Sequence, residues 1–230
     1  GRIFTEGGVI GSEFVIFDQD DDTTNPQVAA LSDGNFVVVF QDEFLGDSAD
    51  FDVRAGIVSE AGSVVGSTFV VVNEDANEED PHVAALAGGG FVVVWRDDDG
   101  DGTGDPGIKA RVYNNSGDAH AAGAFSVNTT TAGNQSDPEV AALADGGFVV
   151  VWTDSGSGLI RGQRFDSIGD KVGSEFTQSS GVEDDPVVAA LSDGRFIVSS
   201  EDVDDAPTDV ELYATIFDPR TSPILGDGAD

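Results

Sequence analysis

One sequence motif occurs four times in this chain of 230 residues and constrains its fold more than any other feature. At its first occurrence it reads Asn25-Pro-Gln-Val-Ala-Ala-Leu-Ser-Asp-Gly-Asn-Phe-Val-Val-Val-Phe40, and it returns from Asp80, Asp137 and Asp185. The prolines of successive copies lie 55, 57 and 48 residues apart. A period of about 50 residues is typical of one supersecondary unit copied in tandem. Internal repetition therefore predicts the architecture before any other argument.

Each copy has the pattern of four antiparallel strands joined by turns. A short apolar segment such as Pro81–Leu86 leads through a Gly-rich turn to the run Phe-Val-Val-Val-Trp, at Phe91–Trp95 and again at Phe148–Trp152. Glycine between apolar runs favours a tight hairpin because it tolerates a positive φ. The apolar run does not alternate with polar residues, so we expect both of its faces to be buried. A polar loop of variable length then leads to a third and a fourth strand, and we find no helical periodicity.

Four antiparallel strands covered on both faces and repeated radially describe the blade of a β-propeller. We predict an all-β, four-bladed propeller of four-stranded blades, with a segment of a longer propeller or a linear repeat array as the alternative. The whole chain, 1–230, is predicted to be one domain, with repeats at about 25–72, 80–127, 137–178 and 185–217. Residues 1–17 contain a fourth strand of the kind that is missing after Phe217, so they are expected to close the ring.

Composition excludes several functional classes. The chain has 44 Asp and Glu against 10 Lys and Arg, a formal charge of −34, so phosphate would be repelled and a nucleic-acid partner is not expected. It has no Cys, which excludes disulfides and thiol catalysis. No apolar run approaches the roughly 20 residues of a membrane span, and no signal peptide is recognised at Gly1. Since Met is also absent, we expect a processed chain or an excised fragment.

The most specific candidate site is an acidic loop after the second strand of the second repeat. From Asp97 to Asp105 it reads D-x-D-x-D-G-x-x-D, which places acids at positions 1, 3, 5 and 9 and glycine at position 6. Such spacing lets a short loop wrap oxygens around Ca²⁺, and position 7 would offer a backbone carbonyl. The loop resembles the calcium loops of integrin-type propeller blades, although those join the first and second strands. The predicted calcium ligands are Asp97, Asp99, Asp101, Thr103 and Asp105.

Other acidic groups and the two tryptophans have weaker signals. The equivalent loops of the first and fourth repeats carry acids that could form irregular sites: Asp42, Asp47, Asp50 and Asp52, and Asp202, Asp204, Asp205 and Asp209. The Asp or Asn before each repeat proline is expected to cap a turn and to set an extended entry to the strand. Trp95 and Trp152 are expected to pack between blades. Arg54, Lys109 and Arg161 recur at one position and are expected to pair with acidic loops.

The repeat is similar to tandem repeats of large secreted calcium-binding and adhesin-like bacterial proteins. The third copy carries the resemblance best, through Pro138–Leu143, Asp145–Trp152 and Gln163–Asp166. The resemblance implies an extracellular, calcium-rich setting, with the protein secreted or at the cell surface. It implies that the protein binds calcium, but it does not identify the glycan or protein that such a module would recognise.

The preferred functional prediction is a non-catalytic, calcium-stabilised module that binds a glycan or a cell-surface protein, and therefore a protein that is not an enzyme. It depends on the absence of a recognisable nucleophile or base constellation, since neither His82 nor His120 has a Ser or Cys beside it. A carboxylate-dependent glycan-active enzyme is one alternative, because acid pairs are plentiful but depend on spacing in three dimensions. A structural spacer of a surface protein is the other. Pairing of two copies into a homo-oligomer is also considered.

Overall fold

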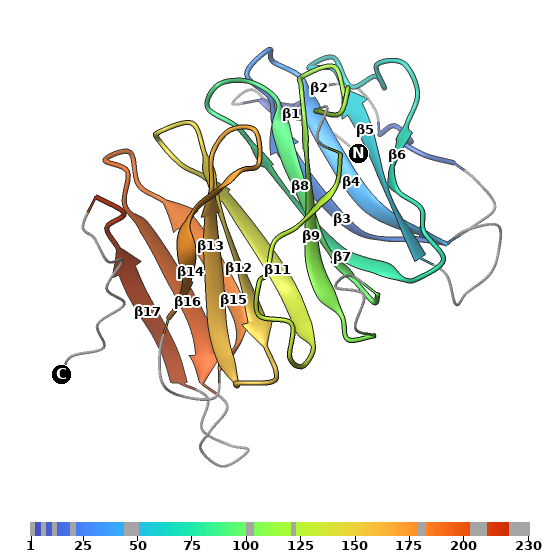
Figure 1. The fold of residues 1–230 in the computed structure, drawn as a ribbon. Coiled ribbons are helices and arrows are strands. Elements are labelled where there is room, and N and C mark those ends of the chain that lie inside the picture. The colour runs from blue at the N-terminus through green and yellow to red at the C-terminus, as the bar shows by residue number, and fades with distance from the viewer. Residues whose placement is uncertain are drawn as a thin grey trace.

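The computed structural model describes residues 3–5, 8–10, 13–18, 22–43, 51–99, 104–120, 123–178, 183–202 and 211–220. These residues form an all-β structure of antiparallel sheets that follow one another along the chain (Figure 1). We call the four larger sheets blades 1 to 4. The part of the chain that the structure describes contains no helix long and apolar enough to cross a membrane.

Blades 1 and 2 each contain four strands in meander order. Blade 1 consists of β3 (Thr23–Ala30), β4 (Phe36–Glu43), β5 (Phe51–Val58) and β6 (Phe69–Val72). Blade 2 consists of β7 (Glu78–Ala85), β8 (Phe91–Asp97), β9 (Gly107–Tyr113) and β10 (Phe125–Ser126).

Blade 3 repeats the four-stranded meander, and three strands of blade 4 are described. Blade 3 consists of β11 (Gln135–Ala142), β12 (Phe148–Asp154), β13 (Leu159–Phe165) and β14 (Lys171–Thr177). Blade 4 consists of β15 (Glu183–Ala190), β16 (Phe196–Asp202) and β17 (Glu211–Phe217). The predicted all-β propeller architecture is confirmed, and the hairpin glycines Gly34, Gly89, Gly146 and Gly194 all have positive φ, from 91° to 94°.

The second strands of blades 2 and 3 are packed on both faces, as their unbroken apolar runs predict. In β12, Phe148, Val150 and Trp152 belong to the hydrophobic cluster shared with blade 2. Val149 and Val151, which point to the opposite face, belong to the cluster shared with blade 4. The alternation of side chains along a strand therefore distributes one apolar run between two neighbouring blades.

Three hydrophobic clusters join blade 1 to 2, blade 2 to 3 and blade 3 to 4. Blades 2, 3 and 4 each repeat one pair of stacked rings, with centroids 5.0 to 5.1 Å apart and planes within 12°. The pairs are Phe91–Tyr113, Phe148–Phe165 and Phe196–Phe217. In blade 1 the corresponding register pair is Phe36 and Val58, without a second ring.

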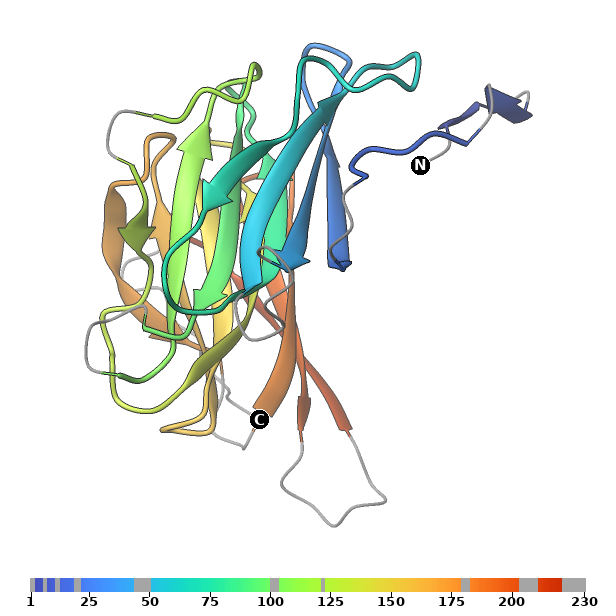
Figure 2. The same cartoon turned by 90° about the vertical axis from the view of Figure 1, so that its right-hand side faces the viewer.

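The four blades form an open arc in the described residues. The inner strands contact one another in the order β3, β7, β11 and β15. The predicted closure by residues 1–17 is not found: β1 (Ile3–Thr5) pairs with β2 (Gly8–Ile10), and Figure 2 shows this hairpin projecting away from the blades. The ring of Phe17 lies 5.3 Å from the ring of Phe40, so the end of this segment packs against blade 1 rather than blade 4.

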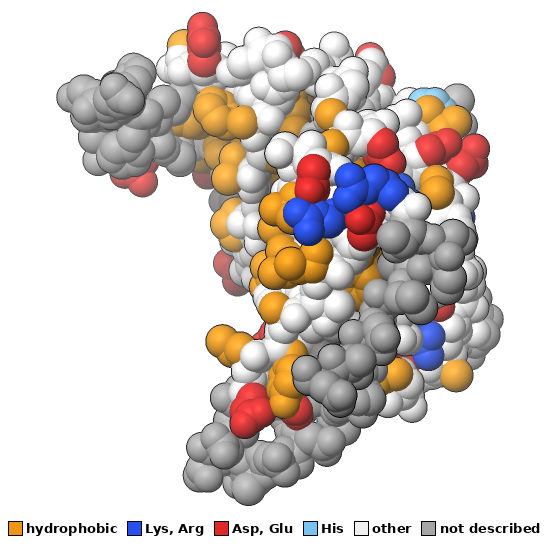
Figure 3. All heavy atoms as spheres, turned by 90° about the vertical axis from the view of Figure 1, so that its left-hand side faces the viewer, with side chains coloured by type: hydrophobic (Ala, Val, Ile, Leu, Met, Phe, Trp, Pro, Cys, Tyr) orange, Lys and Arg blue, Asp and Glu red, His pale blue; other side chains and the backbone are white. Residues whose placement is uncertain are grey.

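The outer face of blade 4 is apolar and exposed. Leu212, Ile216 and Val187 retain 77%, 53% and 55% of their accessible surface. Figure 3 looks onto this side of the molecule and shows hydrophobic side chains next to paired acidic and basic ones. The described residues therefore leave this blade without the apolar cover that blades 2 and 3 receive on both sides. The domain boundaries predicted from the repeats stay a prediction.

We expect Phe148→Ala to lower the free energy of unfolding by about 3–5 kcal/mol, because it removes a fully buried ring from the core between blades. Phe36→Ala is the matched control at the same repeat position. Phe36 is only half-buried and lacks an aromatic partner, so its replacement should cost clearly less. Denaturant unfolding of both variants measures the difference, and equal losses would contradict this account of the core.

Candidate active site at the propeller axis

The residue before each repeat proline has an uncommon backbone conformation. Asn25, Asp80, Asp137 and Asp185 have φ values of 48°, 50°, 52° and 48°, and they are the non-glycine residues with positive φ among those described. Left-handed φ is sterically costly for side-chain-bearing residues, and Asp and Asn tolerate it best. The same strained conformation thus recurs at one position of all four inner strands.

A β-bulge produces this conformation. The pairing of each inner strand with its neighbour shifts register across the Asx-Pro dipeptide, as between Glu79 and His82 in blade 2 and between Ser136 and Glu139 in blade 3. A bulge places an extra residue in one strand and redirects its side chain. The predicted turn cap with an extended entry is therefore wrong: the strand begins three residues before the proline, and the Asx residue lies inside it.

Side chains from neighbouring strands hold these residues in place. The backbone N–H of Asp80 donates to Oε1 of Gln41, a buried residue of the preceding blade, at 3.2 Å. The amide of Asn25 donates to the same oxygen and to Oδ1 of Asp80, the latter at 3.1 Å. Farther round the arc, Oγ1 of Thr153 in blade 3 donates to Asp184, beside Asp185, at 3.1 Å. These contacts link the bulges of blades 1, 2 and 4 to an adjoining blade.

The bulges bring three carboxylates into one cavity. A cavity of about 210 Å³ lies at this end of the inner strands and is lined by Asp80, His82, Asp137, Glu139, Asp185, Pro186 and Val187. We call it the axial acidic pocket. His82 Nδ1 lies 3.2 Å from Oε2 of Glu139. Carboxylate oxygens of Asp137, Asp184 and Asp185 lie within 4.8 Å of one another.

Burial and mutual repulsion perturb the acids of the axial acidic pocket. Desolvation raises the pKa of Asp80 above its usual value, and the charge of Asp137 raises it further. Desolvation also raises the pKa of Asp185, with added repulsion from Asp184 and Asp137. Like charges close together disfavour full ionisation. Perturbed pKa values of this kind are characteristic of groups used in general acid–base chemistry.

The other end of the arc has a different character. A cavity of about 530 Å³ opens between the four Gly-rich hairpins. Its lining consists of equivalent Ala, Leu and Ser residues from every blade: Ala30, Leu31, Ser32, Ala85, Leu86, Ala87, Ala142, Leu143, Ala144, Ala190, Leu191 and Ser192. These side chains offer no titratable group. The described carboxylates that line a cavity along the axis thus lie at the opposite end, in the axial acidic pocket.

The predicted calcium loop is described only in part. Asp101 and Thr103 lie outside the described residues. Oδ1 of Asp97 accepts a hydrogen bond from the backbone N–H of Asp99 at 3.0 Å, which bends the start of the loop, and Asp105 is half-buried. The calcium assignment stays a prediction.

The poorer acidic loops are partly engaged in other contacts. Asp42 is paired with Arg54, and Asp52 accepts a hydrogen bond from Asn73 at 2.6 Å. The following candidates fall outside the described residues: Asp47, Asp50, Asp204, Asp205 and Asp209.

The recurring basic position forms the predicted ion pairs in blades 1 and 3, whereas Lys109 of blade 2 has none among the described residues. The tryptophans pack as predicted. Arg54 pairs with Asp42 in blade 1 and Arg161 with Asp154 in blade 3, each at the end of the second strand. Trp95 and Trp152 are 1% and 0% exposed and belong to the clusters between blades. These tryptophans cannot serve as platforms for a sugar ring because they are not accessible.

No family model and no curated protein matches the sequence. Solved structures do match the fold. An endo-arabinase from Bacteroides thetaiotaomicron aligns over 91% of this chain and 79% of its own, with 15% identity and a TM-score of 0.54. An α-L-arabinofuranosidase from Lactobacillus brevis covers 89% of this chain and 70% of its own, with 10% identity and a TM-score of 0.54. An exo-β-1,3-galactanase from Phanerochaete chrysosporium covers 83% of this chain and 46% of its own, with 11% identity and a TM-score of 0.57.

These matches share the fold, and they correct the preferred functional prediction. We expected a non-catalytic binding or adhesion module that is not an enzyme, whereas the solved structures of this fold reported above are glycan-active enzymes. The repeated β-strand units are confirmed, but the comparisons lend no support to the resemblance with calcium-binding adhesin repeats. The sequence argument failed because it looked for a nucleophile beside a base in sequence. Carboxylates that meet across blades leave no such signal.

The sequence pattern before each repeat proline predicts only a turn-capping role for the aspartates of the axial acidic pocket. The signal that could have identified them is their position: an acid at the same point of three inner strands must meet its equivalents near the axis of a propeller. Asn25 occupies the equivalent position of blade 1 with the same backbone conformation, so the bulge by itself does not require a carboxylate.

We expect Asp137→Asn to lower the pKa of Asp185 and of Asp80 toward the usual range, because it removes a negative charge that disfavours their ionisation. Carbon-detected NMR titration of the Asp carboxyls measures both pKa values. Asp170→Asn, an exposed change in the β13–β14 turn, is the control and should leave them unchanged. Unaltered titration of both groups in Asp137→Asn would show that the three acids are not electrostatically coupled.

Proposed function

We propose that the protein is a carboxylate-dependent enzyme that hydrolyses glycosidic bonds in the axial acidic pocket. The observation that carries this proposal is the recurrence of Asp80, Asp137 and Asp185 at strained bulges of three neighbouring inner strands, around one cavity. Strained backbone at a functional position persists only when the surrounding structure enforces it. The likeness to glycan-active enzymes of the same fold supports the same reading.

The arrangement supplies the two groups that glycoside hydrolysis requires. Asp137 is on β11, between the strands that carry the other two acids, so we assign it the role of the general base. Asp80 or Asp185 then gives a proton to the glycosidic oxygen as the bond from that oxygen to the anomeric carbon breaks. A water molecule attacks the anomeric carbon and transfers its proton to Asp137. Asn25 orients the carboxylate of Asp80 through its amide.

The size of the axial acidic pocket suggests what enters it. At about 210 Å³ it is smaller than the roughly 300–1,000 Å³ of pockets that enclose drug-sized ligands. We infer that it accepts a single sugar residue while the rest of the glycan stays outside. The names of the matched proteins suggest arabinans, arabinofuranosides and β-1,3-galactans as the first substrates to test.

We also retain two proposals that the sequence suggested. One is that the protein is secreted or located at the cell surface, where polymeric glycans are accessible. The other is that calcium binds near the Asp97–Asp105 loop. Fractionation of the producing cells tests the first proposal, and the second is developed below.

We expect the purified protein to release sugar from at least one of these substrates and Asp137→Asn to lower kcat by about 100-fold or more. General acid–base groups contribute roughly 10²–10⁴ to the rate, and the amide cannot accept a proton. Aryl arabinofuranosides and galactosides, together with the two polymers, measure turnover directly. Asp80→Asn and Asp185→Asn should each reduce it too.

The control is again Asp170→Asn, which changes an exposed acid at the opposite end of blade 3 and should retain full activity. Turnover that survives in Asp137→Asn would place the chemistry elsewhere. A folded wild-type protein that leaves the whole substrate panel intact would contradict the proposed function and favour a structural spacer.

A further inference from the structure

Blade 3 contains a buried polar link that fixes one end of its sheet. Nε1 of Trp152 donates to Oε1 of Gln135 at 2.7 Å, and Nε2 of Gln135 donates to Oδ1 of Asp154 at 3.2 Å. All three residues are at most 1% exposed. The amide of Gln135 thus accepts from the indole and donates to the carboxylate, and its buried polar groups are satisfied.

Blade 2 carries a different residue at the centre of the same arrangement. Its register pairs Glu78 with Asp97, as blade 3 pairs Gln135 with Asp154, and Trp95 takes the place of Trp152. A carboxylate cannot donate to Asp97. Oε1 of Glu78 and Nε1 of Trp95 are both buried and have no hydrogen-bond partner among the residues that the structure describes, and Glu78 is 0% exposed.

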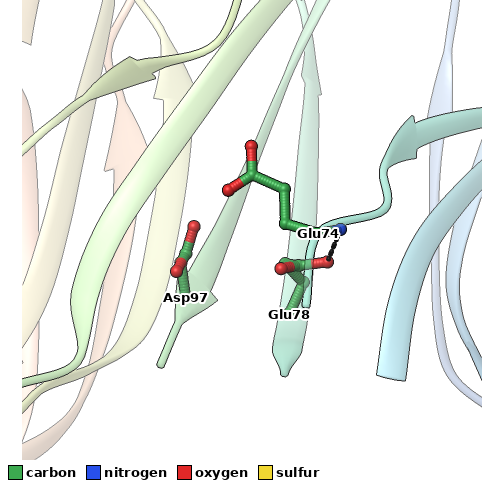
Figure 4. A group of neighbouring side chains, drawn as sticks. All are labelled: Glu74, Glu78 and Asp97. Atoms are coloured by element: carbon green, nitrogen blue, oxygen red, sulfur yellow. Dashed lines mark hydrogen bonds between the residues drawn. The ribbon is translucent and has the colours of Figure 1, made fainter. Parts of the chain in front are cut away.

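A third carboxylate reaches the same point from the connection between blades 1 and 2. Figure 4 shows Glu74, from the segment after β6, beside Glu78 of β7 and Asp97 at the end of β8. One carboxylate oxygen of each lies within 4.8 Å of the others. The backbone N–H of Glu74 lies 3.4 Å from Oε2 of Glu78. Glu74 itself is exposed, which leaves a route from solvent to the buried pair.

Among the described residues, no ion pair balances the charges of this group. Blades 1 and 3 place Arg54 and Arg161 against the strand-end aspartate, but blade 2 has Lys109, which attracts Asp97 without forming an ion pair among the described residues. Desolvation raises the pKa of Glu78 to about 9, and repulsion from Asp97 adds to it. Burial raises the pKa of Asp97 as well. Three carboxylates that meet at one point, with Glu78 fully buried and one of its oxygens unpartnered among the described residues, require a proton or a metal ion between them.

We propose that Glu74, Glu78 and Asp97 bind a Ca²⁺ ion that joins blade 2 to the connection from blade 1. Oxygen-only ligands favour a hard cation, and flexible carboxylate sets with room for water suit Ca²⁺. The unpartnered Oε1 of Glu78 identifies the buried ligand, and sister blade 3 shows how the chain is built where no ion is needed. A cation here neutralises three acids and stabilises the packing between the blades.

This site is distinct from the loop predicted from the sequence. It shares Asp97 with that loop but takes its other ligands from Glu74 and Glu78, which precede the β7–β8 hairpin. Asp99 and Asp105 are not part of it. The proposed hydrolytic function does not depend on this site, because the metal ligands lie outside the lining of the axial acidic pocket.

Glu78→Gln is the decisive variant because it gives blade 2 the residue that blade 3 has at this position. In the wild-type protein we expect Ca²⁺ to raise Tm above the value in NaCl of matched ionic strength, since an ion bound by the native state alone adds stability. Glu78→Gln should fold, lose that increment, and be at least as stable as the wild type in EDTA. Calorimetric titration should show Ca²⁺ affinity reduced by roughly tenfold or more.

Terbium luminescence gives a second readout that does not depend on stability. Trp95 occupies the position at which Trp152 contacts Gln135, so its indole should sensitise Tb³⁺ bound at Glu78. We expect the emission to be lost in Glu78→Gln and Trp95→Phe and to be displaced by Ca²⁺. Glu74→Gln, at an exposed position, should weaken binding without a folding defect.

Asp99→Asn is the matched control in the neighbouring loop and should leave the Ca²⁺ response intact. A wild-type Tm that does not respond to Ca²⁺ would overturn the proposal and identify a proton as the occupant of the cluster. An unchanged Ca²⁺-induced increase in Tm in Glu78→Gln would also overturn the proposal. Loss of that increase in Asp99→Asn alone would assign the ion to the loop predicted from the sequence.

Discussion

The burial of one strand on both of its faces organises this molecule. In blades 2 and 3 the second strand is an unbroken apolar run that packs half of its side chains on the preceding blade and half on the following one, as Phe148 and Val149 show. A strand of this kind is stable only between two other sheets, so the blades must stack face to face around an arc. Stacking in turn places the inner strands β3, β7, β11 and β15 side by side. Side chains at equivalent positions of those four strands therefore lie close together at one end of the propeller axis.

Carboxylates that lie close together repel one another, and the blades reduce this repulsion in different ways. Blade 3 satisfies its strand-end Asp154 with Arg161 and the amide of Gln135. At the equivalent point blade 2 gathers carboxylates around Glu78 with no neutralising ion pair in the described part of the chain, and this contrast is the basis of the proposed Ca²⁺ site. At the bulges, acids are kept close together inside a cavity in three blades, whereas blade 1 has an amide. Departures from the repeat therefore point to function more directly than the repeat itself.

The sequence predicted what is set by local patterns. The repeat period, the hairpin glycines, the double burial of Phe91–Trp95 and the pairing of Arg54 and Arg161 all follow from residue types at fixed spacing. It did not predict the left-handed bulges, because the residue before a proline ordinarily favours an extended backbone and only the pairing register reveals the extra residue. It also missed the cluster at Glu78, whose members come together only when the connection from blade 1 folds back against β8. The predicted ring closure failed because residues 13–17 pack on blade 1.

The central claim is that the bulged aspartates form a binding and reaction centre for a sugar. The most direct measurement is NMR chemical-shift mapping of Asp137→Asn with arabinan- and galactan-derived oligosaccharides, in which catalysis is blocked while binding is retained. The account predicts saturable shifts confined to Asp80, His82, Glu139 and Asp185 and their neighbours on the inner strands. Saturable shifts centred on another surface, such as the exposed apolar face of blade 4, would contradict it.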